Sequence, residues 1–212
     1  ANGNNSTVYL NGSSGNDSNS GTSANAAVKT LDRALLLVKE GGTIYITGTV
    51  TVSDTQEWEM TNSVTIKRRS GFTGPLITVS GGSLTLKNIT INGGSGTPSS
   101  SNIASNTTYA SGSAKAPLIV VESGSELHIR DGTVLEYNSN KPNTSSNGTT
   151  VTVSGYIGLG GAVYCQGDLT MDGGTIRYCE ALSGGGIYIE SADRNWITFD
   201  LSGGTITYNY AR

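Results

Sequence analysis

Apolar and polar residues alternate along most of the chain after residue 42. A spacing of two places one kind of side chain on one face of a β-strand. Gly, Ser, Asn or Asp separates the alternating runs, so this region is expected to form short strands joined by turns. The first apolar pairs of the region are Ile44/Ile46, Val50/Val52 and Val64/Ile66.

One earlier segment has a helical pattern instead. Its apolar residues recur at spacings of three, four and three, at Val28, Leu31, Leu35 and Val38. Residues at these spacings share one face of a helix. Ser23 or Asn25 suits the N-cap and Gly41 suits the position past the end, so we predict a helix over residues 26–40.

The strand-like region contains an internal repeat. Each repeat holds three short strands and two Gly-rich turns, too few residues to bury its own apolar face. Stacked repeats bury that face, so we predict an all-β fold, a right-handed single-stranded parallel β-helix with an N-terminal capping α-helix. The aligned segments are 75–92, 117–138, 161–179 and 185–209.

Stacking predicts ladders of equivalent residues. Three inward ladders are expected, namely Ile77/Ile119/Val163/Ile187, Leu86/Ile129/Met171/Leu201 and Ile89/Val134/Ile176/Ile206. A turn ladder is expected at Asn92/Asn138/Cys179/Asn209, because Asn tolerates left-handed backbone. Cys165 falls on an inward strand position and Cys179 on the turn, which disfavours a disulfide between them.

The pattern also predicts the domain organisation. Residues 1–42 form an N-terminal segment with the capping helix, and residues 43–212 form the coils. Two insertions, 93–116 and 139–160, leave the coils at equivalent positions and are expected to lie side by side. Further β-helix coils are expected beyond Arg212, where another Gly-Gly-x-Tyr start would follow.

The segment Gly15–Ser23, followed by Lys29-Thr30-Leu31 and Ala34, resembles the opening segment of secreted bacterial right-handed β-helix proteins of the pectin lyase-like superfamily. The coil starts Gly-Gly-Ala-Val-Tyr and Gly-Gly-Gly-Ile-Tyr resemble repeats of bacterial surface proteins and adhesins. The resemblance implies a helix that caps the solenoid and an extracellular protein, secreted or attached to the cell wall. The chain lacks the charged signatures of the pectin-cleaving members and has Ala26-Ala27-Val28 where relatives often have Pro.

Composition limits the classes of partner that the chain is expected to bind. Only 14% of the residues are charged, and the net charge is −3. The one basic run, Lys67-Arg68-Arg69, is interpreted as a solvated strand end, so no nucleic-acid partner is expected. No apolar run approaches the ~18 residues of a membrane span, so no membrane insertion is expected.

Aromatic residues among small polar ones suggest a glycan or host surface ligand. Tyr109 and Tyr156 lie in the two insertions, and Tyr164 and Tyr188 are expected to stack on an outward ladder. These four residues are the predicted ligand-binding residues. The resulting function is a secreted or cell-surface bacterial module that acts as an adhesin or carbohydrate-binding domain.

Catalysis is the alternative. The lone His128 and the absence of a nucleophile motif leave paired carboxylates, as in a glycoside hydrolase or polysaccharide lyase. Asp193 and Asp200 are the candidate catalytic residues. Asp168 and Asp172 are weak candidates for a calcium ion, without a recognised motif, and no other cofactor is expected. A third interpretation is a scaffold without a ligand.

Overall fold

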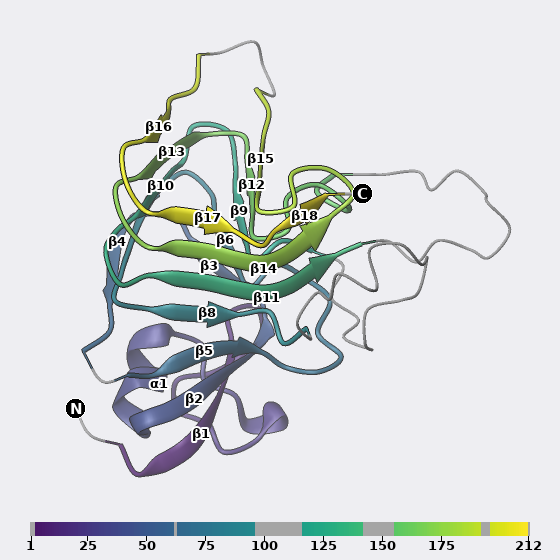
Figure 1. Ribbon diagram of the computed structural model, residues 1–212. Helices are drawn as coiled ribbons and strands as arrows, with labels where there is room; N and C mark the ends of the chain where they lie inside the picture. Colours follow the sequence, from purple (N-terminus) through teal and green to yellow (C-terminus); the bar gives the residue numbers. More distant parts are fainter. Residues whose placement is uncertain (1–2, 62, 96–115, 142–154, 192–195, 212) are drawn as a thin grey trace, which may run out of the picture.

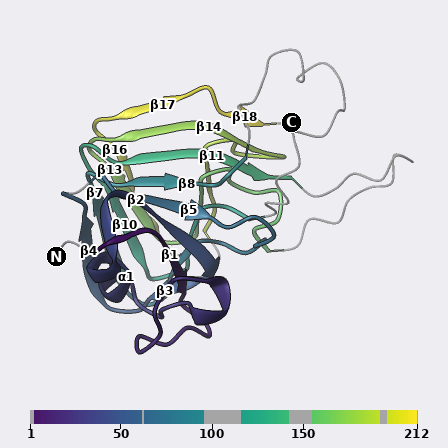
Figure 2. The same ribbon diagram turned by 90° about the horizontal axis from the view of Figure 1, so that it is seen from below.

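The computed structural model describes residues 3–61, 63–95, 116–141, 155–191 and 196–211. The chain winds into a right-handed parallel β-helix whose coils stack along one axis (Figure 1). The predicted fold class is confirmed. Each full coil contributes one strand to each of three parallel sheets, so strands adjacent in space come from successive coils (Figure 2).

The three sheets are named here by number. Sheet 1 contains β1 (Asn5–Asn11), β2 (Val38–Gly48), β5 (Thr65–Arg68), β8 (Thr90–Asn92), β11 (Val134–Asn140), β14 (Thr175–Ala181), β17 (Thr205–Thr207) and β18 (Tyr210–Ala211). Sheet 2 contains β3 (Val50–Val52), β6 (Ile77–Val79), β9 (Ile119–Val121), β12 (Val163–Cys165) and β15 (Ile187–Ile189). Sheet 3 contains β4 (Thr55–Glu59), β7 (Ser83–Lys87), β10 (Glu126–Ile129), β13 (Asp168–Met171) and β16 (Phe199–Leu201).

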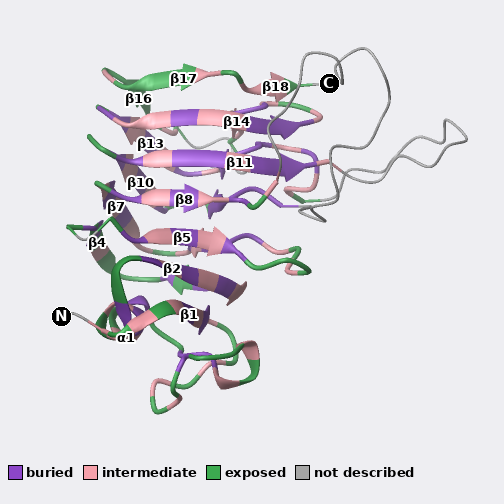
Figure 3. Ribbon diagram, turned by 60° about the horizontal axis from the view of Figure 1, so that its bottom comes forward, coloured by how far each residue is buried: buried purple, intermediate pink, exposed green. Residues whose placement is uncertain are grey.

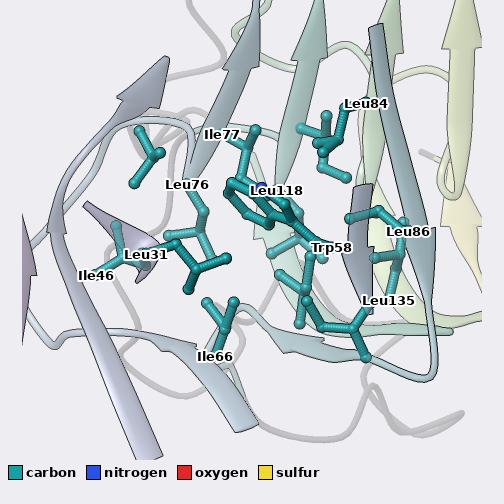
Figure 4. Packing of buried hydrophobic residues seen from close by; sticks show 14 of the residues in the cluster. Leu31, Ile46, Trp58, Ile66, Leu76, Ile77, Leu84, Leu86, Leu118 and Leu135 are labelled. Carbon is teal, nitrogen blue, oxygen red and sulfur yellow. The ribbon is translucent and has the colours of Figure 1, made fainter. Parts of the chain in front are cut away.

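Two of the predicted inward ladders are confirmed. Ile77, Ile119, Val163 and Ile187 pair in register along sheet 2. Leu86, Ile129, Met171 and Leu201 pair in register along sheet 3. In the middle coils these side chains are fully buried and meet residues from the other two sheets (Figure 4). Burial of each such side chain contributes about 1.5–3 kcal/mol to the free energy of unfolding. The inward ladders are therefore the main source of the stability of the fold.

The third predicted ladder is wrong by two residues in its first coil and by one residue in its second. Ile91, not Ile89, pairs with Leu135, which in turn pairs with Ile176. Val134 pairs with Thr90 on the outward side of sheet 1. The slip of one residue puts the Val134 side chain on the opposite face of the strand, whereas Ile89 and Ile91 are both buried.

The turn ladder also differs from the prediction. Asn92 pairs with Glu136, whereas Asn138 pairs with Cys179. The left-handed residue is the Tyr that precedes this position, at Tyr137, Tyr178 and Tyr208, with φ of 51°, 54° and 52°. Their rings stack at centroid distances of 5.1 and 5.5 Å, and this stacking offsets the strain of a bulky residue at positive φ.

The capping helix is shorter than predicted. It spans α1 (Leu31–Leu37), and Thr30 accepts a hydrogen bond from the Arg33 amide as its N-cap. Residues before it form the short 3-10 helix η1 (Ala24–Ala26) and a bridge between Val28 and Leu10. Val38 already begins β2. The apolar residues from Val28 to Val38 therefore lie in three different local structures: a bridge, the helix α1 and the strand β2. The helical spacing alone does not distinguish these structures.

The helix still covers the first coils. Leu31 and Ala34 are buried in the same apolar cluster as the strands of sheet 1. Asp17 joins the preceding segment to the helix, because its carboxylate accepts hydrogen bonds from the Lys29 and Thr30 amides at 2.8 and 2.9 Å. No helix in the described ranges is long and apolar enough to cross a membrane.

The last coil is open. Phe199, Leu201 and Ile206 occupy inward ladder positions, yet they are 47%, 49% and 41% exposed. Figure 3 shows β17 of this coil largely in the colour of exposed residues, in contrast to β14 and β11. Their equivalents one coil earlier, such as Met171 and Ile176, are fully buried. The difference arises because full burial of an inward side chain needs a neighbouring coil on both sides.

The basic run is not a solvated strand end throughout. Arg68 is only 5% exposed, and its guanidinium donates hydrogen bonds to the Pro117 carbonyl and the Asn138 side chain at 3.4 and 3.3 Å. Burial lowers the pKa of Arg68 to about 10. Arg68 therefore connects its own coil to later coils through buried hydrogen bonds.

Both cysteines are free and buried. Cys165 occupies the ladder position of Val121 and Ile189, as expected of a small apolar residue. Burial raises the pKa of the Cys165 thiol to about 11 and that of Cys179 to about 12. In the folded protein, both thiols are therefore neutral at pH 7.

Truncation of Leu86 should destabilise the protein far more than truncation of Leu201 on the same ladder. Leu86→Ala leaves a cavity in a fully buried site and should lower the free energy of unfolding by about 3 kcal/mol. Leu201→Ala removes a half-exposed side chain and should lower it by less than about 1.5 kcal/mol. Denaturant unfolding measures both, and equal losses would contradict the open last coil.

The Cys165→Val variant should resist alkaline unfolding better than the wild type. The thiol ionises above pH 9 when unfolded but only near pH 11 when folded, so the stability that it contributes below pH 9 is lost as pH rises between these values. Val occupies the same position at Val79 and Val121, so the substitution fits the ladder. Melting curves at pH 8 and pH 10.5 should show a smaller loss in the variant; equal losses would refute the assignment.

Candidate functional site

A polar groove runs along the corner between sheet 2 and sheet 3. It encloses about 450 Å³, within the ~300–1,000 Å³ range of ligand sites. Its walls come from five consecutive coils, so at ~4.8 Å per coil it extends about 19 Å along the solenoid axis. The lining residues are Asp54, Thr55, Gly81, Gly82, Ser83, Ser123, Gly124, Ser125, Glu126, Gly167, Asp168, Trp196 and Ile197.

Glycines form the floor of this groove. A Cβ on Gly167 would overlap the Ser125 carbonyl oxygen, and a Cβ on Gly82 would overlap the Asp54 carbonyl oxygen. The turns of successive coils therefore stack backbone on backbone, with no side chain between them. The same close approach leaves the space above the turns unfilled, which creates the groove.

Side chains that leave the floor form a polar ladder. Thr55, Ser83, Glu126 and Asp168 pair in register at the start of the sheet 3 strands. Glu126 contacts His128 at 2.7 Å, and Asp168 accepts a hydrogen bond from the Thr198 amide at 2.6 Å. Asp54 accepts one from the Gln56 side chain at 2.6 Å. These contacts hold each carboxylate in place and leave it acceptor positions for a ligand.

An aromatic side chain stands at the last coil of the groove. Trp196 is fully exposed, in contrast to Trp58, which is buried in the core. An exposed indole loses the ~25 cal/mol per Å² that burial of its apolar surface would supply. This exposure is the feature of the groove that most needs a ligand to explain it.

The predicted tyrosine site has a different arrangement. Tyr164 stacks on Tyr188 at 6.1 Å and meets Tyr156 edge-on at 6.5 Å. Tyr164 is only 4% exposed, and its hydroxyl donates a hydrogen bond to Glu190. Burial and this hydrogen bond raise the pKa of Tyr164 well above its usual value. The structure thus brings three of the four predicted binding residues together, but the Tyr164 ring faces its neighbours rather than solvent.

The other candidates do not gather into one site. Tyr109 and Asp193 lie outside the described residues, as do 96–115 and 142–154 of the insertions. Asp200 is exposed on β16, where it pairs with Thr170, and it does not line the groove. Its carboxylate is therefore separated from the polar ladder.

Asp168 begins β13 and Asp172 directly follows its last residue, Met171, about 13 Å further along the chain. Asp172 forms an ion pair with Arg130 at 3.2 Å. Within the described ranges, no group of three or more His, Cys, Asp or Glu side chains is arranged to hold a metal ion.

Sequence reasoning missed the groove and its residues Asp54, Glu126 and Trp196. A signal was present in the repeated small-residue turns, Ser-Gly-Gly-Ser at 80–83 and Ser-Gly-Ser at 123–125. From the sequence alone, such turns indicate only where one strand ends and the next begins. Their effect on the surface depends on how closely the coils stack.

Comparisons with models of known protein families, with curated proteins and with solved structures find no match to this chain.

A methyl group on the floor should damage both the groove and the fold. Gly167→Ala places a Cβ on the Ser125 carbonyl oxygen and should lower the free energy of unfolding by about 2 kcal/mol or more. Ser123→Ala, on the exposed rim of the same groove, is the control and should change it by less than about 0.5 kcal/mol. Denaturant unfolding of both variants tests the steric origin of the groove, and a neutral Gly167→Ala would contradict it.

Proposed function

We propose that this chain is a carbohydrate-binding module of an extracellular bacterial surface protein, an adhesin of the pectin lyase-like type, and that the groove binds the glycan. The observation that carries the proposal is the fully exposed Trp196 beside a row of fixed carboxylates and hydroxyls. Sugars present both kinds of surface, apolar C–H faces and dense hydroxyls. The groove offers a matching partner for each.

The spacing of the coils supports a linear glycan. Equivalent groove residues repeat every ~4.8 Å, which is close to the length of one hexose unit. Successive sugars in a groove parallel to the solenoid axis would therefore meet equivalent residues, such as Ser83, Glu126 and Asp168, one coil after another. The stacked coils form a rigid scaffold, so little order has to be gained on binding.

The extracellular location rests on the resemblance of the opening segment and on the excess of Gly, Ser, Thr and Asn. Neither argument depends on the groove.

A carbohydrate-active enzyme is the second candidate, and one observation favours it. Glu126 and Asp168 occupy adjacent positions of the polar ladder and both line the groove. Neighbouring strands are ~4.8 Å apart, near the ~5–5.5 Å that separates the carboxyl groups of retaining glycosidases. This pair replaces Asp193 and Asp200 as the first candidate for a hydrolytic role.

A glycan array probed with the wild type and with Trp196→Ala tests the proposed binding. We expect a set of linear glycans to bind the wild type, and the variant to lose about tenfold or more in affinity, because the indole supplies the apolar contact. Tyr208→Ala is the control, since Tyr208 is also an exposed aromatic residue but does not line the groove.

The array separates the two candidate functions when it is read for both bound protein and intact glycan. Binding without glycan loss supports the module. Loss of glycan that disappears in Glu126→Gln supports the enzyme. Unchanged binding by Trp196→Ala would show that the groove is not the site.

A further inference from the structure

The groove has an unusual charge distribution for a chain with 13 basic and 16 acidic residues. Its described lining residues include three carboxylates, those of Asp54, Glu126 and Asp168, and none of these described residues is Lys or Arg. Glu126 is paired with His128 at 2.7 Å, and Lys87 and Arg130 are bound to Glu59 and Asp172 at the other end of the sheet 3 strands. In the described part of the groove, carboxylates therefore outnumber basic side chains.

The three carboxylates are spread along the groove rather than collected at one point. Glu126 and Asp168 lie on adjacent coils, ~4.8 Å apart. Asp54 precedes Thr55, which is two coils away from Glu126 on the same ladder, or about 10 Å. A compact metal ion needs ligands that converge, and these side chains do not converge. A ligand with charges at intervals along its length fits them better.

Anionic polymers are excluded by the same geometry. A uronic acid chain in this groove would place a carboxylate on each sugar beside the carboxylates of the ladder. Like charges at these distances repel, and among the described lining residues no Lys or Arg offsets the repulsion. The apolar Trp196 and Ile197 at one end favour a ligand with ring faces over a flexible polyamine.

We propose that the groove selects linear oligosaccharides of amino sugars with free, protonated amines over neutral and acidic oligosaccharides of the same length. The inference rests on the proposed glycan-binding function and names the ligand class of that site. Each ammonium group would lie against one carboxylate of the ladder, and Trp196 would contact a sugar ring. Successive sugars would follow successive coils.

The size of the preference follows from the exposure of the groove. Ion pairs in contact with solvent are weak individually and are screened by salt. Two or three such pairs together should favour the amino sugar by about tenfold at low ionic strength. The preference should shrink to about twofold in molar salt, whereas the contact with Trp196 should persist.

Calorimetric titration of the intact chain with three hexasaccharides tests the proposal. The probes are hexamers of glucosamine, of N-acetylglucosamine and of galacturonic acid, used at low and high salt. The variants are Asp168→Asn and Glu126→Gln, which remove charge and keep size. Asp32→Asn, on the helix α1 far from the groove lining, is the control for a loss of net charge.

We expect the glucosamine hexamer to bind tightest, and each groove variant to lose about threefold of its preference over the N-acetylated hexamer. The Asp32 control should retain it. Equal binding of the glucosamine and N-acetylglucosamine hexamers would overturn the inference and leave the proposed glycan-binding function intact. Tighter binding of the galacturonic acid hexamer would also overturn it.

Two further outcomes are decisive. If the glucosamine hexamer binds best but neither groove variant alters the preference, the attraction belongs to the acidic chain as a whole and the inference fails. If no hexamer binds and Trp196→Ala leaves the array signal unchanged, the proposed function fails together with the inference.

Discussion

Hydrogen bonding between successive coils, at ~4.8 Å, is the constraint on which the rest of this structure depends. A single coil has three short strands and cannot enclose its apolar side chains. When coils stack in register, residues such as Leu86 and Ile129 lose all contact with water. The same rule explains the last coil, where Leu201 has a partner on one side only and remains half exposed.

The stacking distance also dictates the turns. Side chains cannot fit where one turn lies directly on the next, so glycine is required at positions such as Gly82 and Gly167. Elsewhere the chain accepts positive φ in a bulky residue, because Tyr137, Tyr178 and Tyr208 regain the lost energy by stacking. The Gly-rich turns between sheets 2 and 3 border the groove, whereas the turns at Tyr137, Tyr178 and Tyr208 carry stacked rings.

The same stacking aligns polar side chains of successive coils along the solenoid axis. A polar residue at one strand position acquires neighbours from the coils above and below, as in the ladder of Ser83, Glu126 and Asp168. Carboxylates from distant parts of the sequence then act together, which favours a long ligand with a repeat similar to that of the coils. The fold and the proposed glycan site are consequences of one periodicity.

Much of the architecture was determined by the sequence alone. Period-two alternation and the repeat of Gly-rich turns were sufficient to predict a parallel β-helix and two of its inward ladders, because both signals are local. The tertiary structure decided the rest. The turns set the register that separates Ile91 from Ile89, and close stacking created the groove that brings together Asp54, Glu126, Asp168 and Trp196. Those residues are far apart along the chain, and only the number of coils between them determines their distance.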